Sequence, residues 1–452
     1  MKTDFGHAFC GGGPATVGAF ICAARTGRLD ELLEAGVLVI ERGQKLGGGS
    51  LRHYGISSNS LAVAFLEGLD EIQPGRQFDG VRSDPATKEL RTMSGVHAPL
   101  SLAGAYLDAL GATVEMILDE HPACEVARET RVREMRIGED GVTIAAENGV
   151  PRSIAVKKAV IAMGGRAPAG VEQLTVLPGL TLERYRHKLR HAAALFDDRI
   201  GLPEALLDAV RTTGRVTIVG GSHSAWSVAW LLMNDATFRT DEGGPPTVTM
   251  LHRSPIRLFY LTTEDAVAEH YAFDPDRDVC PVSGRVNRVG GLKGDARELA
   301  RQALGVIESD LPIHLLPLGR DGADVAVEAL DDAGLIVAAT GYEPQLPALV
   351  SESGERIVPA KSTSGLVVSD ELEVVDTRGR ALPGVLAYGL GVGIRAPTRV
   401  GGEPSNERAI TSVWLYQHDV GQVALNSLMG VDDVEAHSMM PALTPGALGS
   451  GF

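Results

Sequence analysis

The fold is decided near the N-terminus by the sequence FGHAFCGGGPATVG, residues 5–18. It begins with a short apolar run, passes through three glycines and continues into a stretch rich in alanine and leucine that reads as a helix up to residue 33. A second apolar run, VLVI at 37–40, ends at Glu41. Strand, glycine turn, helix and strand make one βαβ unit, from which doubly wound α/β sheets are built.

The glycine turn has the composition of a pyrophosphate-binding loop. Gly11 allows a tight bend, and the missing Cβ of Gly13 lets the backbone approach a phosphate at the positive end of the helix. Pro14 suits the first helical turn because its missing N–H costs nothing there. Glu41 closes the next strand, where an acid binds ribose hydroxyls. A glycine turn in an ordinary α/β protein is the alternative. We expect nucleotide contacts from Gly11, Gly13, Pro14, Ala15, Glu41 and Arg42.

A second unit of the same kind begins at Val216. Residues 216–219 read as the strand, Gly220-Gly221-Ser222 as the turn and residues 224–233 as the helix. Serine hydroxyls and backbone N–H groups at such a turn can hydrogen-bond phosphate oxygens. Arg253-Ser254 follows the next strand and suits the 2′-phosphate of NADP, where NAD would need an acid; a surface arginine is the alternative. We expect coenzyme contacts from Gly220, Ser222, Ser224, Arg253 and Ser254.

Three motifs resemble those of the flavin-dependent lysine and ornithine N-hydroxylases. Residues 11–18, GGGPATVG, are similar to the G-x-G-P-x-N-L-G start of that family, with Thr16 where the family usually carries asparagine. Residues 339–342 read ATGY, like a strand-end motif of the family, and residues 220–225 resemble its NADPH-binding loop. The resemblance implies FAD and NADPH as cofactors. It adds His223, Ala225, Thr340, Gly341 and Tyr342 to the expected cofactor-binding residues.

The resemblance also gives a role to the glycine- and serine-rich segment 47–60. In a two-domain flavoprotein this segment would run beside the flavin ring, where glycines allow close approach and small polar groups can bond the N5 or O4 edge or a peroxide. Asn59 is the catalytic candidate, and a flexible surface loop is the alternative for the segment. We expect flavin contacts from Gly48, Gly49, Ser50 and Leu51, and from Gly389 after the strand at 384–388.

The reaction class follows from the same resemblance. It favours an NADPH-dependent FAD monooxygenase that N-hydroxylates an amine or amino acid through a C4a-hydroperoxyflavin. The alternative is an FAD-dependent NAD(P)H oxidoreductase with a non-disulfide acceptor, since no C-x-x-C pair is present. A binding or sensor protein without turnover is the third reading. Gly389-Leu390 departs from the common G-D flavin motif, so the subfamily is not defined by the motifs.

The order of the motifs predicts the domain organisation. Buried strands that end in glycine occur again after the second βαβ unit. This order predicts two Rossmann-like dinucleotide-binding domains, with the NADPH domain inserted into the FAD domain. We expect residues 1–206 to form the first part of the FAD domain and 207–338 the NADPH domain. Residues 339–452 then complete the FAD domain, with a final helix from about residue 406 to 428 and a tail from 431 with few signals.

The composition of the chain limits the classes of partner that we expect. The net charge of −16 argues against nucleic acid and anionic membranes, because phosphate backbones need a basic surface. The four cysteines form no metal-spaced cluster, so we expect no metal and reduced thiols in a cytoplasmic protein. The N-terminus lacks a signal pattern, and we expect no membrane-spanning run. The expected partners are a small-molecule substrate and O2, with a homo-oligomer left open.

Overall fold

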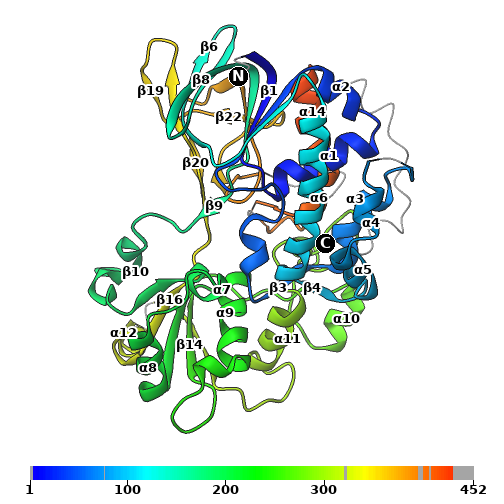
Figure 1. The fold of residues 1–452 in the computed structure, drawn as a ribbon. Helices are drawn as coiled ribbons and strands as arrows, with labels where there is room; N and C mark the ends of the chain where they lie inside the picture. Colours follow the sequence, from blue (N-terminus) through cyan, green and yellow to red (C-terminus); the bar gives the residue numbers. More distant parts are fainter. Residues whose placement is uncertain (1–3, 76, 320–322, 395–400, 407–408, 431–452) are drawn as a thin grey trace.

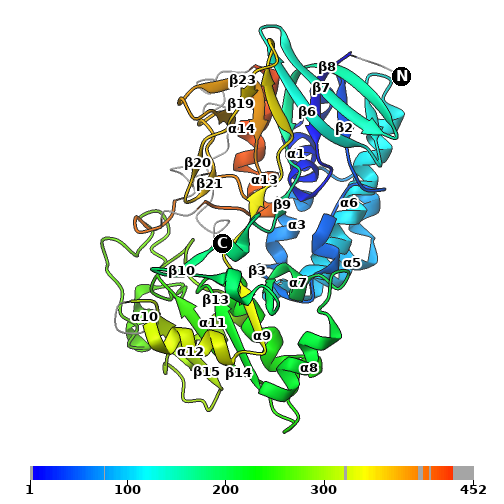
Figure 2. The same cartoon turned by 90° about the vertical axis from the view of Figure 1, so that its left-hand side faces the viewer.

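The computed structural model describes residues 4–75, 77–319, 323–394, 401–406 and 409–430, whose main strands form two sheets (Figures 1 and 2). The first sheet has ten strands, and β23 (Ala381–Ala387) and β22 (Glu373–Val375) branch from its middle strand. Its main path runs β19 (Arg356–Ile357), β18 (Ala348–Ser351), β6 (Arg131–Gly138), β7 (Gly141–Asn148), β8 (Val150–Ile161), β1 (Asp4–Cys10), β2 (Val37–Ile40) and β5 (Glu125–Ala127).

Strand β8 joins an antiparallel part of this sheet to a parallel part. Residues 150–156 pair antiparallel with β7, and residues 159–161 pair parallel with β23. On its other side, β8 runs parallel to β1 in a register that places Cys10 opposite Ile161. The alternating residues 142–146 and 154–156 predict an antiparallel hairpin, and the apolar residues 159–163 predict a separate buried strand. The structure joins the two into one long strand.

Helices cover the first sheet around its parallel part. The single helix expected from 14 to 33 is wrong, because Gly27 adopts a φ of +73° and divides it. The two pieces are α1 (Pro14–Arg25) and α2 (Leu29–Glu34). The other elements of this region are η1 (Gly49–His53), β3 (Ser57–Leu61), α3 (Ala62–Asp70), α4 (Asp79–Arg82), α5 (Pro85–Thr92), β4 (His97–Pro99), α6 (Leu100–Glu120), α13 (Val413–Gln417) and α14 (Asp419–Met429).

Helix α6 is the one described helix that is long and apolar enough to cross a membrane by length and composition alone. The expectation of no such run is therefore wrong as a statement about sequence. In this structure α6 is a core helix, because Tyr106, Leu107 and Leu110 are fully buried in the first domain.

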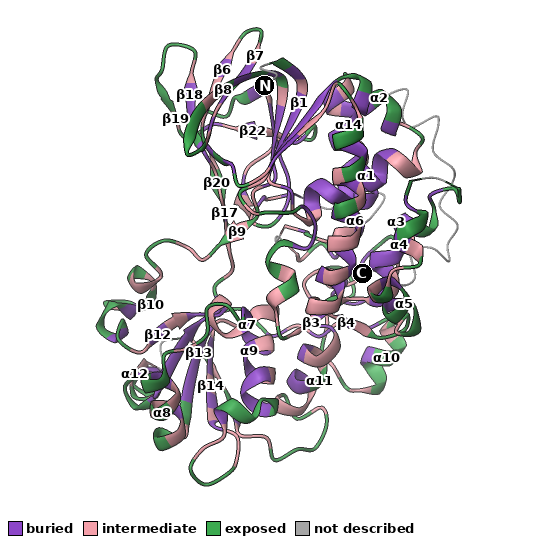
Figure 3. Cartoon of the chain, in the orientation of Figure 1, coloured by how far each residue is buried: buried purple, intermediate pink, exposed green. Residues whose placement is uncertain are grey.

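The second sheet is wholly parallel and lies between two apolar layers. The burial view shows its strands enclosed within the lower part of the molecule (Figure 3). Ile218 packs into one apolar cluster and its neighbour Val219 into another, as expected for a parallel sheet with both faces covered. The strand order is β12 (Leu189–His191), β16 (Leu335–Ala338), β13 (Arg215–Val219), β14 (Thr247–His252) and β15 (Ile313–Pro317). The main helices are α8 (Glu204–Thr213), α9 (His223–Asn234), α11 (Gly294–Ala303) and α12 (Ala323–Asp332).

The second domain is inserted into the first. The chain leaves the first sheet after β8, builds the second sheet and returns through β18 to β23. The two connections pair with each other at the waist of the molecule, as β9 (Gly165–Arg166) and β17 (Glu343–Pro344) (Figure 1). The second sheet begins with β12, before the expected boundary at residue 207. With only three residues, β12 is too short to show a period in the sequence.

The C-terminal region differs from expectation at its start. The last helical pair begins at Val413, capped by the Ser412 side chain, and not near residue 406. The expected tail from 431 lies outside the described residues.

Shorter elements complete the chain: η2 (Val171–Gln173), β10 (Thr175–Leu177), β11 (Leu180–Thr181), η3 (Leu182–Tyr185), α7 (Ala193–Phe196), η4 (Ala236–Phe238), α10 (Thr263–Ala268), β20 (Lys361–Ser362) and β21 (Gly365–Leu366).

Candidate functional site

The first glycine turn lies between β1 and α1 and combines two kinds of glycine. Gly11 has a φ of +107°, and a Cβ there would lie 2.3 Å from the carbonyl oxygen of Ala162. Gly13 has a φ of −79°, and a Cβ there would meet no protein atom within 4 Å. Gly13 is also the N-cap of α1 and gives the helix no side-chain cap. The turn therefore has both the room and the N–H donors for a pyrophosphate.

The acid of the second strand lies against this turn. The Oε2 atom of Glu41 accepts the N–H of Gly12 at 2.7 Å, and Oε1 accepts the N–H of Gly43 at 2.7 Å. Each carboxylate oxygen keeps a further lone pair for a ribose hydroxyl. On the other side, Gly389 has a φ of +117°, and its added Cβ would lie 3.6 Å from the Cβ of Ala15. Strand ends and helix start thus form a cradle that fits the dinucleotide part of FAD.

The second glycine turn repeats the first in its geometry. Gly220 has a φ of +141°, and a Cβ there would lie 2.4 Å from the carbonyl oxygen of Ala339. Its N–H donates to Leu251 at 2.9 Å, just as the N–H of Gly11 donates to the end of β2 at 2.8 Å. Helix α9 starts at once and has no side-chain cap from Ser222. Ser224 and the buried Ala225 form the first turn of this helix.

Arg253 and Ser254 lie exposed beyond β14, as their position in the sequence predicts. The Arg253 guanidinium donates to the backbone carbonyl of Thr175 in β10. One backbone carbonyl occupies only part of a guanidinium, so donors remain for a phosphate. The carbonyl of Ser254 lies 3.0 Å from Nδ1 of His252.

Close packing against helix α6 explains part of the glycine content of segment 47–60. Gly48 donates its N–H to Oδ1 of Asp108 at 2.9 Å, and a Cβ there would lie 2.4 Å from the carbonyl oxygen of Gly104 in α6. The expected reason for this glycine, approach to a flavin ring, is therefore incomplete. Gly49 is the open position, since the nearest atom to its added Cβ is the Cδ of Pro14 at 3.9 Å.

Ser50 and Leu51 connect η1 to both domains. The Ser50 hydroxyl lies 3.3 Å from a guanidinium nitrogen of Arg199, which pairs with the buried Asp197 at 2.6 Å. The Arg199 guanidinium holds the pKa of the Asp197 carboxyl below its usual range. Leu51 packs against the core of the first domain. Residues 197–199 follow β12, so this contact ties the expected flavin segment to the start of the inserted domain.

The motif at 339–342 lies where β16 leaves the second sheet. Thr340 is exposed, whereas Gly341 accepts a hydrogen bond at 3.0 Å from Nε2 of His191. Nδ1 of the same ring accepts the N–H of Ala193, so His191 is neutral, and burial lowers its pKa. The ring also meets the Tyr342 ring edge-on, with centroids 5.2 Å apart. Burial raises the pKa of the Tyr342 hydroxyl.

Arg42 contacts the connection between the domains. Its guanidinium donates to Oε1 of Gln345 at 2.9 Å, and the amide of Gln345 donates to the carbonyls of Met163 and Gly165. In this structure Arg42 therefore contacts the linker, whereas the neighbouring Glu41 contacts the glycine turn.

Asn59 lines a small cavity between the two domains. The cavity has a volume of about 20 Å³, room for about one water. It is bounded by β3, the start of α9 and the start of α11. Asn59 and His223 were expected at the site, whereas the other polar residues were not. The lining residues are Ile56, Ser57, Ser58, Asn59, His223, Ser227, Trp230, Lys293, Asp295 and Ala296.

Lys293 is the residue of this cavity that sequence reasoning missed. It is 9% exposed, and burial lowers the pKa of its ammonium group from 10.5 to about 7. Its backbone N–H donates to Nε2 of His223 at 3.1 Å, which joins the starts of α9 and α11. The signal in the sequence was a concentration of basic residues in a loop that also contains Arg285 and Arg288.

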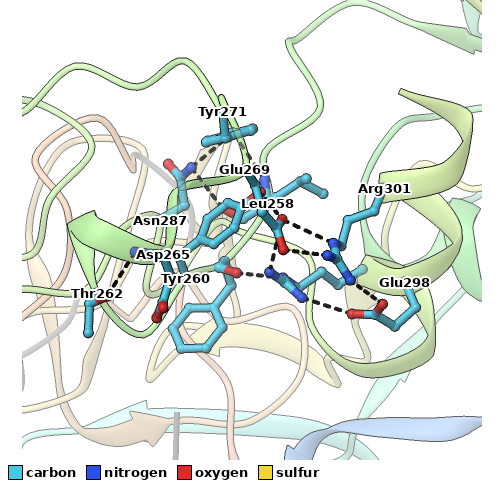
Figure 4. Close-up of polar contacts among 11 residues, drawn as sticks. Leu258, Tyr260, Thr262, Asp265, Glu269, Tyr271, Asn287, Glu298 and Arg301 are labelled. Atoms are coloured by element: carbon cyan, nitrogen blue, oxygen red, sulfur yellow. Dashed lines mark hydrogen bonds and ion pairs between the residues drawn. The ribbon is translucent and has the colours of Figure 1, made fainter. Parts of the chain in front are cut away.

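A partly buried polar network joins α11, which follows Lys293, to the segment around α10. Arg301 and Arg297 pair with Glu269, which also accepts the hydroxyl of Tyr260 at 2.9 Å (Figure 4). The amide of Asn287 donates to the carbonyl of Leu258 and to a tyrosine hydroxyl, as the same view shows. These contacts place the loop before α11 in a defined position against the cavity.

Comparison with known proteins identifies the family. No protein-family model matches the chain. The chain is 35% identical over 446 residues to the CMP-5′-(3-aminopropyl)phosphonate hydroxylase of Streptomyces rubellomurinus, which covers 96% of this chain and 99% of that protein. The chain belongs to the flavin-dependent N-hydroxylating monooxygenases. Its fold is similar to the ornithine hydroxylase of Pseudomonas aeruginosa (TM-score 0.53, 12% identity, 95% of this chain and 100% of that chain).

A second solved fold agrees with the first. The L-lysine 6-monooxygenase of Pseudomonas syringae matches with a TM-score of 0.50 at 15% identity, over 94% of this chain and 99% of that chain. The enzyme is an FAD- and NADPH-dependent monooxygenase, and its partners are a small-molecule substrate and O2. The expectations of fold class, cofactors and reaction class are thereby confirmed. The expected roles of single residues stay predictions.

Proposed function

We propose that this enzyme hydroxylates the primary amine of a cytidine-nucleotide-linked aminoalkylphosphonate. The observation that carries the proposal is the 35% identity to the CMP-5′-(3-aminopropyl)phosphonate hydroxylase over nearly the full length of both chains. The match extends over 96% of this chain, and so over both domains. The amine or amino acid expected from the motifs becomes, in this proposal, an amine that carries a phosphonate and a nucleotide.

The overall reaction consumes one O2, one NADPH and one proton for each amine. One oxygen atom is inserted into an N–H bond of the amine, the other leaves as water, and NADPH leaves as NADP+. Bound FAD and NADPH supply this redox chemistry, and the protein supplies binding and orientation. In the proposal, the turn at Gly11–Gly13 with Glu41 holds the FAD dinucleotide, and the turn at Gly220–Ser222 holds the coenzyme pyrophosphate. The Asn59 amide, in the wall of the cavity, orients the substrate amine by hydrogen bonding.

The test is a comparison of amines with the FAD-loaded enzyme under NADPH and O2. The amines are CMP-5′-(3-aminopropyl)phosphonate, free 3-aminopropylphosphonate, ornithine and lysine. We expect the highest kcat/KM, and hydroxylamine formation matched to NADPH oxidation, with the cytidylylated amine. A preference for ornithine or lysine, or NADPH oxidation that yields only hydrogen peroxide with every amine, would contradict the proposal.

A further inference from the structure

Lys293 is a buried cation with no anionic partner at hydrogen-bonding distance. Within the described part of the chain, its ammonium group makes no hydrogen bond or ion pair, and its one recorded contact is with the Phe259 ring, 5.1 Å from the centroid. Burying a charge without a partner is costly, and a core position would be served better by an apolar residue. An unpaired ammonium in a cavity wall therefore points to an anion that binds there.

The surroundings of Lys293 strengthen the positive potential. Arg288 and Arg285 are buried nearby and act with burial to lower the pKa of Lys293, whereas the buried Glu403 opposes them. The two carboxylate oxygens of Glu403 are held by the backbone N–H groups of Val289 and Gly290, at 2.9 and 2.7 Å. Glu403 is therefore fixed by the loop and does not reach Lys293 as an ion-pair partner.

Asp295 of α11 is the other charged residue that lines the cavity, and His97 of β4 packs against the start of α11. Asp295 lies in the first turn of α11, and the buried face of His97 lies against Gly294. Burial lowers the pKa of His97, and Lys293 lowers it further while Asp295 raises it. Asp295 thus places a carboxylate in the wall that also contains Lys293, an arrangement that suits a ligand with both an anionic and an amine end.

Two helix starts add to the site. Helices α9 and α11 both begin at the cavity, with His223 and Asp295 in its wall, and neither has a side-chain cap. The dipole at each helix start favours an anion. The backbone N–H of Lys293 donates to Nε2 of His223 and so links the two helix starts.

We propose that Lys293 binds a phosphonate or phosphate oxygen of the substrate at the cavity between β3, α9 and α11, whose volume of about 20 Å³ admits one such oxygen atom. This inference rests on the proposed function for the identity of the ligand. The coenzyme is a second source of phosphate oxygens, but its pyrophosphate is expected at the Gly220 turn, before α9. Lys293 lines the same cavity as Ser57, Ser58 and Asn59 of β3 in the FAD domain. We assign the site to the substrate, and the binding of NADP+ in the experiment below tests that assignment.

The experiment measures ligand binding to FAD-loaded wild-type and Lys293→Met enzyme by calorimetry, with steady-state kinetics in parallel. The ligands are CMP-5′-(3-aminopropyl)phosphonate, 3-aminopropylphosphonate, 3-aminopropan-1-ol and NADP+. We expect Lys293→Met to weaken binding of both phosphonates at least tenfold and to raise KM with little change in kcat. Binding of NADP+ and of 3-aminopropan-1-ol, which carries no phosphonate, should not change, and Lys293→Arg should recover part of the lost affinity.

The controls separate this inference from the proposed function. Lys88→Met changes an exposed lysine on α5 and should behave like the wild type. If the wild type binds 3-aminopropylphosphonate through Lys293 but hydroxylates no cytidylylated amine, the proposed function is wrong and the anion site stands. If Lys293→Met binds both phosphonates as tightly as the wild type, or loses NADP+ in their place, the site assignment is wrong.

Discussion

Gly11 and Gly13 lie two residues apart, yet the protein needs glycine there for different reasons. At Gly11 a side chain would strike the Ala162 carbonyl, and the backbone is left-handed. At Gly13 the backbone is ordinary and the space beside it is free of protein atoms. The first glycine serves the fold, and the second serves the ligand. The sequence motif contains both and does not distinguish them, because the distinction depends on β8, which lies far away along the chain.

Gly13→Val should give a folded protein that does not retain FAD. The side chain meets no protein atom but fills the space beside the start of α1, where the pyrophosphate would bind. The measurement is the flavin absorbance of the purified protein together with its far-ultraviolet circular dichroism. Gly95→Val, at an exposed position with equal free space, should stay yellow. A yellow Gly13→Val protein would place the dinucleotide elsewhere.

Arg253→Ala should reduce the preference for NADPH over NADH. Arg253 follows the end of β14, where the 2′-phosphate is expected. Its replacement removes only one hydrogen bond within the protein, the one to the Thr175 carbonyl. A lost charge-assisted hydrogen bond at an exposed site is worth about 1.5 kcal/mol, or roughly tenfold in the ratio of kcat/KM values. Flavin reduction followed under anaerobic conditions with each coenzyme measures that ratio. An unchanged ratio of kcat/KM values for the two coenzymes would show that another residue binds the 2′-phosphate.

Lys293 should make the stability of the free enzyme depend on pH. Its folded-state pKa is about 7, below the 10.5 of an exposed lysine. Between these values the unfolded chain binds a proton that the folded chain does not, so the free energy of unfolding rises with pH across this range. Below pH 7 the burial cost is fully present. Urea unfolding of wild type and Lys293→Met at pH 6 and pH 9 should show the variant to be more stable, most clearly at pH 6. Equal differences at both pH values would contradict this.

At the scale of elements, α6 and the segment 47–52 contact through backbone. An added Cβ at Gly104 would lie 2.5 Å from the backbone nitrogen of Arg52, and one at Gly111 would lie 2.4 Å from the carbonyl of Leu46. The βαβ units were predictable because their apolar runs and glycine turns are local in the sequence. This contact, the strand β12 and the setting of Lys293 were not, because each depends on residues brought together by the fold.

Gly104→Leu should destabilise the protein by about 1–3 kcal/mol, the usual cost of overpacking a tight contact. The same change should weaken FAD binding, because η1 and Gly49 would be displaced from the start of α1. Thermal unfolding and FAD titration measure the two effects. Ala112→Leu, on an exposed position of the same helix, should change neither. A Gly104→Leu enzyme with normal stability would show that η1 does not depend on this contact.

At the scale of the whole molecule, two paired connections join a pair of nucleotide-binding domains. The β9–β17 pair, the Gln345 contacts and the His191–Gly341 hydrogen bond all lie at this junction. The cavity with Asn59 and Lys293 lies between elements of the two domains, so the inserted topology places the coenzyme turn, the flavin segment and the proposed substrate site around one junction. The insertion was predictable from motif order, whereas the cavity required the structure.

The most direct test of N-hydroxylation follows the oxygen atoms. The FAD-loaded enzyme is reduced with one equivalent of NADPH without oxygen and then mixed with isotope-labelled O2 and CMP-5′-(3-aminopropyl)phosphonate. We predict a hydroxylamine that carries one labelled oxygen atom on nitrogen, in an amount that approaches the NADPH consumed. Recovery of unmodified amine, with all the label in hydrogen peroxide and water, would contradict the assignment of this enzyme as an N-hydroxylating monooxygenase for such amines.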